Sequence, residues 1–136
     1  MYTFLTASKD ATIYKQQPTQ NTGLDEILEV SKTYYGNSKD VAHTLIKFET
    51  TALSASLASG AVTMSSAELI LRECEANEIP MDYVIYANPI TQSWDMGIGT
   101  RFDDISTDGV TWNHRTTGID WITNELYITG SVTGWY

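Results

Sequence analysis

The chain has 136 residues, a length at which one compact domain can bury a core without disulfides. Its 17 Asp and Glu residues outnumber its 8 Lys and Arg residues, and the formal charge of -9 would repel phosphate backbones, so we expect no nucleic-acid partner. Cys74 is the only cysteine, which excludes an intrachain disulfide within this sequence. We therefore expect a single domain over residues 1–136, which could be the N-terminal part of a longer chain.

The N-terminal stretch MYTFLTASKDATIY lacks the features of a secretory signal. It has no basic segment, no apolar run of sufficient length and no small-residue cleavage site. Elsewhere no apolar run is long enough to cross a bilayer, so we expect no membrane insertion. If Met1 is the native start, the protein folds in the cytoplasm of the cell that makes it.

The first part of the chain favours short strands separated by turns. Tyr2–Phe4 and Ala11–Tyr14 are rich in β-favouring residues. The polar segment QQPTQNTGLDE follows, and its Pro18, Asn21 and Gly23 supply turn chemistry. We therefore expect two short strands followed by an irregular crossing.

Further strands are predicted before residue 50. Ile27–Val30 and Thr33–Tyr35 are β-favouring, and Gly36–Asn37 predicts a turn after them. The run HTLIKFE, His43–Glu49, has apolar residues on both faces, which is typical of the central strand of a sandwich. The residues of this run predicted to lie in the core are Ile46 and Phe48.

The middle of the chain combines a connection with two predicted strands. Thr51–Ser66 is small and polar, and we expect a long connection in which one helical turn could end at Gly60. The run AELILREC, Ala67–Cys74, alternates with a period of two and predicts a strand, although a helix is the alternative. YVIYA, Tyr83–Ala87, is the clearest strand signal. The core residues predicted in these two runs are Leu69, Leu71, Val84 and Tyr86.

A last strand is predicted at Asn124–Thr129, where Leu126 and Ile128 alternate with polar residues. Many short strands joined by polar crossings are typical of an all-β protein. We therefore expect an antiparallel β-sandwich with jelly-roll or Greek-key connections.

Three stretches together resemble the DNRLRE-type domains, which are relatives of carbohydrate-binding modules found in bacterial surface proteins and phage particles. DATIYKQQPTQNTGLDEILEV resembles their first two strands and the turn between them, and HTLIKFE with SSAELILREC resembles their next two strands. SWDMGIGT followed by GVTWN resembles their late tryptophan motif. The resemblance covers roughly residues 7 to 121 and implies a jelly-roll sandwich.

Two features of the sequence qualify this resemblance. The insertion RFDDISTDG between the two tryptophan elements makes the chain look more like phage virion proteins than like secreted modules. His43 stands near the usual place of an arginine, and Met96 replaces an acidic residue of the usual turn. Ligand chemistry that depends on those two family residues is not implied for this chain.

The stretch from Ser93 to Trp121 holds three tryptophans and several aspartates, and it is the candidate functional region. The aspartates lie among Gly, Ser and Thr in a polar loop, whereas a glycosidase needs one carboxyl in an apolar pocket. No nucleophile, phosphate-binding or metalloprotease motif is present, so we expect no enzyme activity. The tryptophans are predicted to close the sandwich, with Trp94 and Trp112 in the core.

Ligand binding is a second interpretation of the same region. Trp121 could stack on a sugar, with Asn113 and Arg115 as hydrogen-bond donors beside it. The run DDISTDG offers oxygen ligands of the kind that Ca²⁺ prefers, although an Asx-rich turn is the favoured explanation. We expect no other metal and no cofactor. The aspartates of this predicted ligand-binding set are Asp103, Asp104 and Asp108.

The function expected from these features is that of a phage structural protein. In this hypothesis the domain is exposed on the virion as a capsid decoration, fibre or tail-associated adhesion module. Its partners would be other virion proteins, copies of itself in a homo-oligomer, and a host-surface glycan. The alternative is a carbohydrate-binding module of a secreted or cell-surface protein, which would be extracellular.

Overall fold

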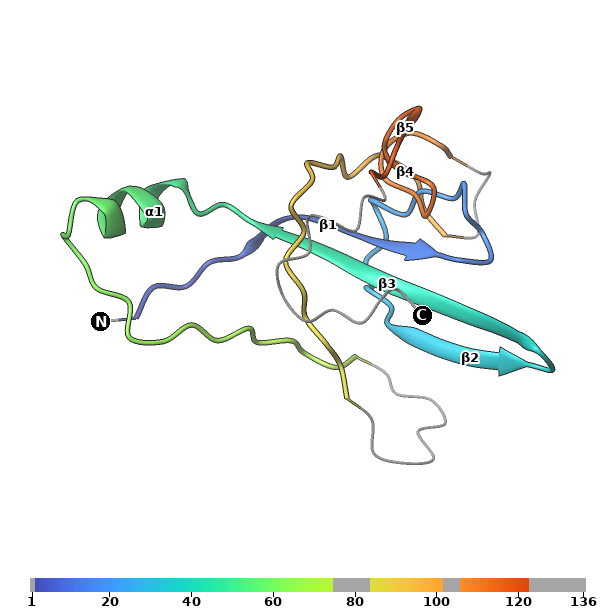
Figure 1. Ribbon diagram of the computed structural model, residues 1–136, viewed down its shortest axis with the longest axis horizontal. Coiled ribbons are helices and arrows are strands. Elements are labelled where there is room, and N and C mark those ends of the chain that lie inside the picture. Colours follow the sequence, from blue (N-terminus) through green and yellow to red (C-terminus); the bar gives the residue numbers. More distant parts are fainter. Residues whose placement is uncertain (1, 75–83, 102–105, 123–136) are drawn as a thin grey trace.

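The computed structural model describes residues 2–74, 84–101 and 106–122 (Figure 1). This part of the chain is mostly strands with one short helix, and its two sheets are antiparallel. The sheets have the strand orders β1-β3-β2 and β4-β5. In chain order the elements are β1 (Ala7–Tyr14), β2 (Ser31–Tyr35), β3 (Ser38–Phe48), α1 (Thr51–Ala58), β4 (His114–Thr116) and β5 (Ile119–Asp120).

Strand β3 is the central strand of the larger sheet, as the HTLIKFE run predicted. β1 pairs along nearly its whole length, from Ala7 opposite Phe48 to Tyr14 opposite Ala42. β2 pairs with the first half of β3 through a hairpin, which turns at Gly36 with a φ of 61°. This left-handed conformation suits glycine, because a Cβ would be strained there.

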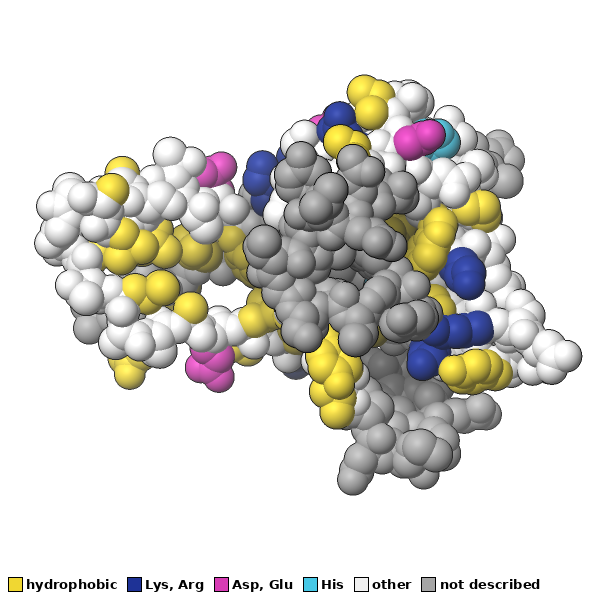
Figure 2. Space-filling model, viewed as in Figure 1, with side chains coloured by type: hydrophobic (Ala, Val, Ile, Leu, Met, Phe, Trp, Pro, Cys, Tyr) yellow, Lys and Arg dark blue, Asp and Glu magenta, His cyan; other side chains and the backbone are white. Residues whose placement is uncertain are grey.

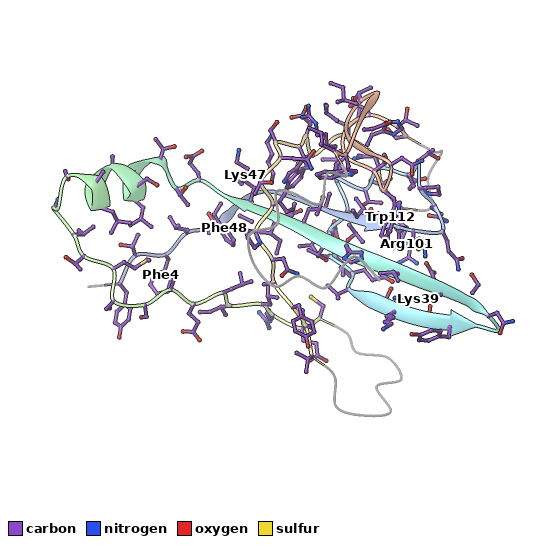
Figure 3. The ribbon with its side chains drawn as sticks, viewed as in Figure 1. Phe4, Lys39, Lys47, Phe48, Arg101 and Trp112 are labelled. Atoms are coloured by element: carbon purple, nitrogen blue, oxygen red, sulfur yellow. The ribbon has the colours of Figure 1, made fainter. Side chains whose placement is uncertain are left out.

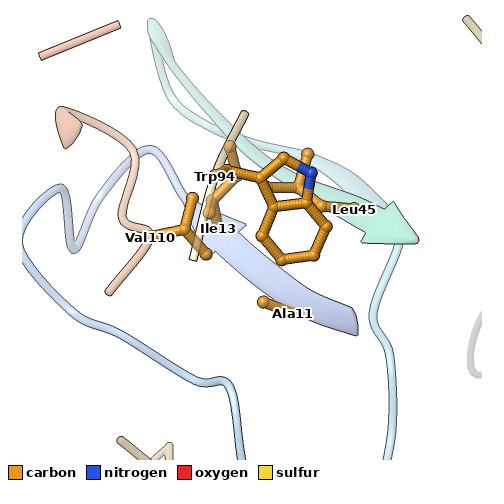
Figure 4. Close-up of a cluster of buried hydrophobic side chains, with 5 residues drawn as sticks. All are labelled: Ala11, Ile13, Leu45, Trp94 and Val110. Atoms are coloured by element: carbon orange, nitrogen blue, oxygen red, sulfur yellow. The ribbon is translucent and has the colours of Figure 1, made fainter. Parts of the chain in front are cut away.

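The core lies between one face of this sheet and the loops that follow (Figure 4). Ala11 and Ile13 of β1 and Leu45 of β3 share a face because side chains alternate along paired strands. Trp94 and Val110, from loops far along the sequence, pack against them, and all five side chains are buried. The partly buried residues packed against this cluster are Met96, Trp112 and Trp121.

The segment after β3 contains a helix where the sequence favoured a connection with one helical turn. Helix α1 covers Thr51–Ala58, and Gly60 follows with a φ of 73°. None of its residues is buried, because its small and polar composition gives it no apolar stripe to pack. In Figure 1 it lies at the end of the molecule away from β4 and β5.

Two predicted strands are not strands in the structure. Residues 67–74 and 84–87 carry no assigned strand, and Leu69, Leu71, Val84 and Tyr86, predicted to lie in the core, are between 47% and 80% exposed. Alternating apolar residues become buried only when their strand pairs and packs, and these runs pair with none of the described strands. The prediction that these four residues lie in the core is therefore wrong, since all four are exposed.

Smaller differences concern the ends of other runs. Tyr2–Phe4 is exposed and not a strand, and residues 27–30, also predicted as a strand, lead into β2 without belonging to it. Ile46 and Phe48 are half-buried, because strand alternation places both on the face of the sheet opposite Leu45 and the core cluster. The predicted strand Asn124–Thr129 lies outside the described residues.

Candidate binding surface

The Asn21 side chain joins three segments that are distant in sequence. Its Nδ2 donates to the carbonyls of Met96 at 2.8 Å and Val110 at 2.7 Å. Its Oδ1 accepts from the N–H groups of Gly23 at 3.2 Å and Gly99 at 2.7 Å. These bonds use both donors and both lone pairs of the amide, so the fully buried Asn21 is satisfied. The sequence predicted only a turn here.

Glycines make this close approach possible. A Cβ on Gly97 would lie 2.5 Å from the Asn21 amide atoms, and one on Gly99 would lie 2.4 Å from the Asn21 carbonyl oxygen. Gly23 and Gly109 are equally confined, because a Cβ on either would meet the backbone near Met96 at under 3.0 Å. Gly97, Gly99 and Gly109 of the tryptophan region therefore serve packing around Asn21.

The three tryptophans of this region face inward to different extents. Trp94 is buried in the core, as expected, and Trp112 packs beside it with its ring 5.3 Å from that of His43. Trp121, predicted as a ligand-stacking residue, also packs against the core, and its Nε1 donates to the Thr111 carbonyl at 3.0 Å. The indole of Trp121 is thus oriented by the protein itself.

Other members of the predicted ligand-binding set bind within the chain. Arg115 Nη1 donates to the Ser93 carbonyl at 3.0 Å, and Asp108 Oδ1 accepts from the Thr117 hydroxyl at 2.9 Å. Asn113 is exposed. Asp103 and Asp104 lie outside the described residues, and among the residues that are described no three His, Cys, Asp or Glu side chains form a metal-binding group.

Asp95 is a carboxylate that two other side chains hold at this end of the molecule. Its Oδ2 accepts from the Thr116 hydroxyl at 2.6 Å, and its Oδ1 lies 3.5 Å from Lys9 Nζ. The Thr116 hydrogen bond, followed by that from Lys9, lowers the pKa of Asp95 below its ordinary value. A carboxylate kept ionised in this way suits structural pairing, whereas a general acid needs a raised pKa.

The five lysines of the chain all lie on one face of the sheet β1-β3-β2, which we call the lysine face. Residues directly opposite each other in antiparallel strands share a face, and Lys9 pairs with Lys47 while Lys32 pairs with Val41. Lys15 extends β1 by one residue, since its N–H donates to the Val41 carbonyl at 2.9 Å. The remaining lysine, Lys39, lies two residues from Val41 on β3 and therefore on the same face.

Three of these lysines surround the hairpin end of the sheet. Lys15 and Lys32 flank Val41 on its two sides, and Val41 is only 6% exposed. Tyr34 pairs with Lys39 and is 65% exposed, and Lys32 Nζ lies 5.8 Å from the centre of the Tyr34 ring. Figure 2 shows basic side chains gathered beside hydrophobic ones over the β2–β3 end of the sheet.

The opposite face of the same sheet carries acids. Asp10 and Asp40 project from it by strand alternation. It is covered by the segment Leu24–Val30, which we call the acidic segment because it contains Asp25, Glu26 and Glu29. Thr12 and Thr44 fix this segment, since Thr12 Oγ1 accepts from Glu29 N–H at 3.0 Å and Thr44 Oγ1 donates to the Glu29 carbonyl at 3.0 Å.

A tyrosine, a glutamate and an arginine hold the acidic segment on the sheet. Glu29 accepts from the Tyr14 hydroxyl at 3.2 Å and forms an ion pair with Arg101, whose guanidinium lies 4.9 Å from the centre of the Tyr14 ring. Burial, followed by the nearby Glu29 charge, raises the pKa of Tyr14 to about 12. Arg101 N–H also donates to Asp25 at 2.7 Å.

The two faces therefore differ in the sign of their charge. Figure 3 shows Lys39 and Lys47 toward opposite ends of β3, so the lysine face extends along the strand. Sequence reasoning missed this separation because it requires the pairing register. The register shows that Lys39 and Lys47 share their face with the buried Val41 and Leu45. The sequence signal that could have revealed this face is that the lysines of β3 stand at positions separated by an even number of residues.

Comparison of the chain with protein-family models, curated proteins and solved structures found no match. Within residues 2–74, 84–101 and 106–122, no helix is long and apolar enough to cross a membrane.

Proposed function

We propose that this protein is a non-enzymatic structural component of a phage particle, exposed as a capsid decoration, fibre or tail-associated adhesion module. In this proposal the domain is an antiparallel sandwich of jelly-roll topology, and the sheet β1-β3-β2 is part of it. Its partners are other virion proteins, further copies of the chain and, as a secondary ligand, a host-surface glycan. Its place of action is the virion.

The observation that carries this proposal is the exposure of two apolar runs. Leu69, Ile70 and Leu71 are consecutive and exposed, and so are Val84, Ile85 and Tyr86. Three consecutive exposed apolar residues are unfavourable in an isolated soluble domain unless another surface covers them. Neighbouring subunits in a particle would supply that surface and gain the hydrophobic free energy of covering it.

The polar groups of the tryptophan region also support a structural role, because they bind other groups of the same chain. Asp95 is bound by Thr116 and Lys9, Arg115 by Ser93, and Asp108 by Thr117. Neither of the two carboxylates is buried in an apolar pocket, since both residues are exposed. Their bonds fix the loop conformation, which suits a surface that presents a constant shape to partners.

The test is the copy number of the protein in purified particles, measured together with a density map. We expect a fixed stoichiometry and density at symmetry-related positions. Absence from particles, together with binding on a glycan array, would contradict the proposal and favour the carbohydrate-binding alternative.

The glycan measurement needs a variant that leaves the fold intact. Trp121 is unsuitable because it packs against the core. Asn113→Ala removes an exposed amide beside Trp112, and Asn37→Ala removes an equally exposed amide in the β2–β3 turn as a matched control. Loss of glycan binding in Asn113→Ala alone would place a sugar site in the tryptophan region.

A further inference from the structure

We propose that the lysine face of one copy of this chain binds the acidic segment of a second copy, so that copies associate head to tail. The contact surface on the first copy is the hairpin end with Lys15, Lys32, Lys39 and Tyr34. On the second copy it is the segment Leu24–Val30. This inference names a contact within the proposed assembly and rests on that proposed function.

Charge complementarity is the first argument. All five lysines project from one face of the sheet, although the chain as a whole has a formal charge of -9. The acidic segment covers the other face, where Glu26 is exposed. Opposite charges on opposite faces favour a contact between unlike faces and disfavour a contact between like faces.

Apolar complementarity is the second argument. Leu24, Ile27 and Val30 of the acidic segment are each more than half exposed, although the segment is fixed to the sheet through Glu29. On the lysine face the exposed Tyr34 and the aliphatic stems of Lys32 and Lys39 offer apolar area beside the charges. Each surface thus combines exposed apolar groups with charges that the other surface matches.

A second copy fits the lysine face better than a sugar does. A sugar site needs an open aromatic ring, but Lys32 lies over the Tyr34 ring and the Trp112 ring packs with His43. In a homo-oligomer, another copy of the same chain is always present as an acidic partner. Because the two contacting surfaces are different, the association is heterologous and continues into a ring or a filament.

The test is sedimentation velocity of the purified full chain at increasing concentration and at two salt concentrations. We expect association that weakens with salt, because the Debye length falls from roughly 10 Å at 0.1 M to roughly 3 Å at 1 M. The variant Lys32→Glu with Lys39→Glu should raise the dissociation constant by about tenfold or more, since like charges would then face each other.

A matched control carries the same change in net charge elsewhere. Lys47→Glu with Arg72→Glu alters two exposed residues away from the hairpin end, Lys47 being ~26 Å from Lys39 along β3. We expect it to associate nearly as the wild type does. If the Lys32 and Lys39 glutamate variant loses its fold, Lys32→Gln with Lys39→Gln tests the same contact without charge reversal.

Mixing two defective variants distinguishes a head-to-tail contact from a symmetric one. Glu26→Lys with Ile27→Lys alters only the acidic segment, so it retains a normal lysine face. Mixed with the variant Lys32→Gln with Lys39→Gln, which has no charge complementary to the new lysines, it should form one-to-one dimers, because one intact contact remains between the two variants. Failure of the mixture to dimerise would overturn the proposal, as would a wild-type chain that stays monomeric or associates independently of salt.

These outcomes are separate from those of the proposed function. Salt-dependent association of a protein that is absent from particles would keep this contact and contradict the virion role. Conversely, a protein present in particles whose Lys32 and Lys39 glutamate variant associates normally would keep the virion role and contradict this contact.

Discussion

At the scale of single residues, Asn21 accounts for the arrangement of loops around the core. Four hydrogen bonds from one buried amide connect Gly23, Met96, Gly99 and Val110. Each of these backbone groups would otherwise be left without a partner in a dry environment, where an unsatisfied group costs about 1 to 3 kcal/mol. The loops carrying Trp94 and Val110 are therefore held to the sheet by polar contacts as well as by packing.

Asn21→Ala should destabilise the protein by at least ~3 kcal/mol, because several buried N–H and carbonyl groups lose their partners at once. Urea denaturation of the purified chain measures this change. Asn37→Ala, in the exposed β2–β3 turn, is the control and should change stability by no more than about 0.5 kcal/mol. Equal stability of the two variants would show that the Asn21 amide does not hold the loops.

The free energy of unfolding is expected to fall at alkaline pH because the buried Tyr14 phenol resists ionisation. Its pKa rises from 10.0 to about 12 on folding, chiefly through burial, so the folded state favours the neutral phenol. This contribution is complete below the unfolded pKa of 10.0 and is lost as pH rises from there through about 12.

The measurement is the free energy of unfolding as a function of pH in the wild type and in Tyr14→Phe. The wild type should lose stability across that alkaline window, and Tyr14→Phe should lose less, because it has no phenol to ionise. Tyr34, which is 65% exposed, supplies the matched variant Tyr34→Phe, and this variant should keep the wild-type slope. Parallel curves for all three proteins would contradict the assignment to Tyr14.

At the scale of elements, neighbouring positions near the end of β3 differ in how deeply they are buried. Leu45 lies in the core cluster opposite Ala11, whereas Phe48 lies at the end of the strand and is half-buried. Leu45→Ala should cost about 2 to 5 kcal/mol as a core truncation. Phe48→Ala should cost less than about 3 kcal/mol, the lower end of the range for buried phenylalanine, since part of its ring remains in water.

Thermal or urea denaturation of both variants checks this order. A larger loss for Phe48→Ala than for Leu45→Ala would show that the end of β3 is buried by contacts that the described residues do not include. The order matters because the HTLIKFE pattern alone predicts both Ile46 and Phe48 in the core.

Much of the sheet could be predicted from the sequence because its signals are local. The apolar residues on both faces of HTLIKFE indicated a central strand, and Gly36 indicated the hairpin turn. The burial of residues 67–73 and 84–87 could not be predicted in this way. Their periodicity describes what a paired strand would bury, but pairing depends on a partner that local pattern does not identify.

The candidate surface was less predictable than the sheet. Trp121, Asn113 and Arg115 drew attention because of their residue types, yet Trp121 and Arg115 hydrogen-bond to the backbone of the same chain. The lysine face depends on the register between β1, β3 and β2, so the separate positions of its lysines in the sequence gave no reason to group them. The residue types predicted which side chains could bind a ligand, whereas the pairing register of the strands determined which charged side chains lie together.

At the scale of the whole molecule, two kinds of surface point toward association. The charged faces would give contacts that weaken with salt, and the apolar runs around Ile70 and Ile85 would give contacts that salt weakens little. An assembly that used both would show a salt-sensitive and a salt-resistant step. The two contacts can therefore be separated by changing residues of one surface at a time.

Ile70→Lys with Ile85→Lys tests the apolar runs. In the isolated chain we expect stability within about 0.5 kcal/mol of the wild type, because both side chains are exposed. In particles we expect reduced incorporation, because a lysine in a covered apolar contact leaves a charge without water or a partner. Ile119→Lys, at an exposed position of β5 outside both runs, is the control and should leave incorporation unchanged.

Denaturation and particle stoichiometry together decide between two explanations of the apolar runs. A loss of several kcal/mol in the isolated chain would mean that the runs bury their side chains within one copy, as the strand predictions for AELILREC and YVIYA required. Unchanged stability with reduced incorporation would mean that other subunits cover them. In the second case the cluster around Leu45 and Trp94 is the core that a single copy forms among its described residues, and the two apolar runs are buried on assembly.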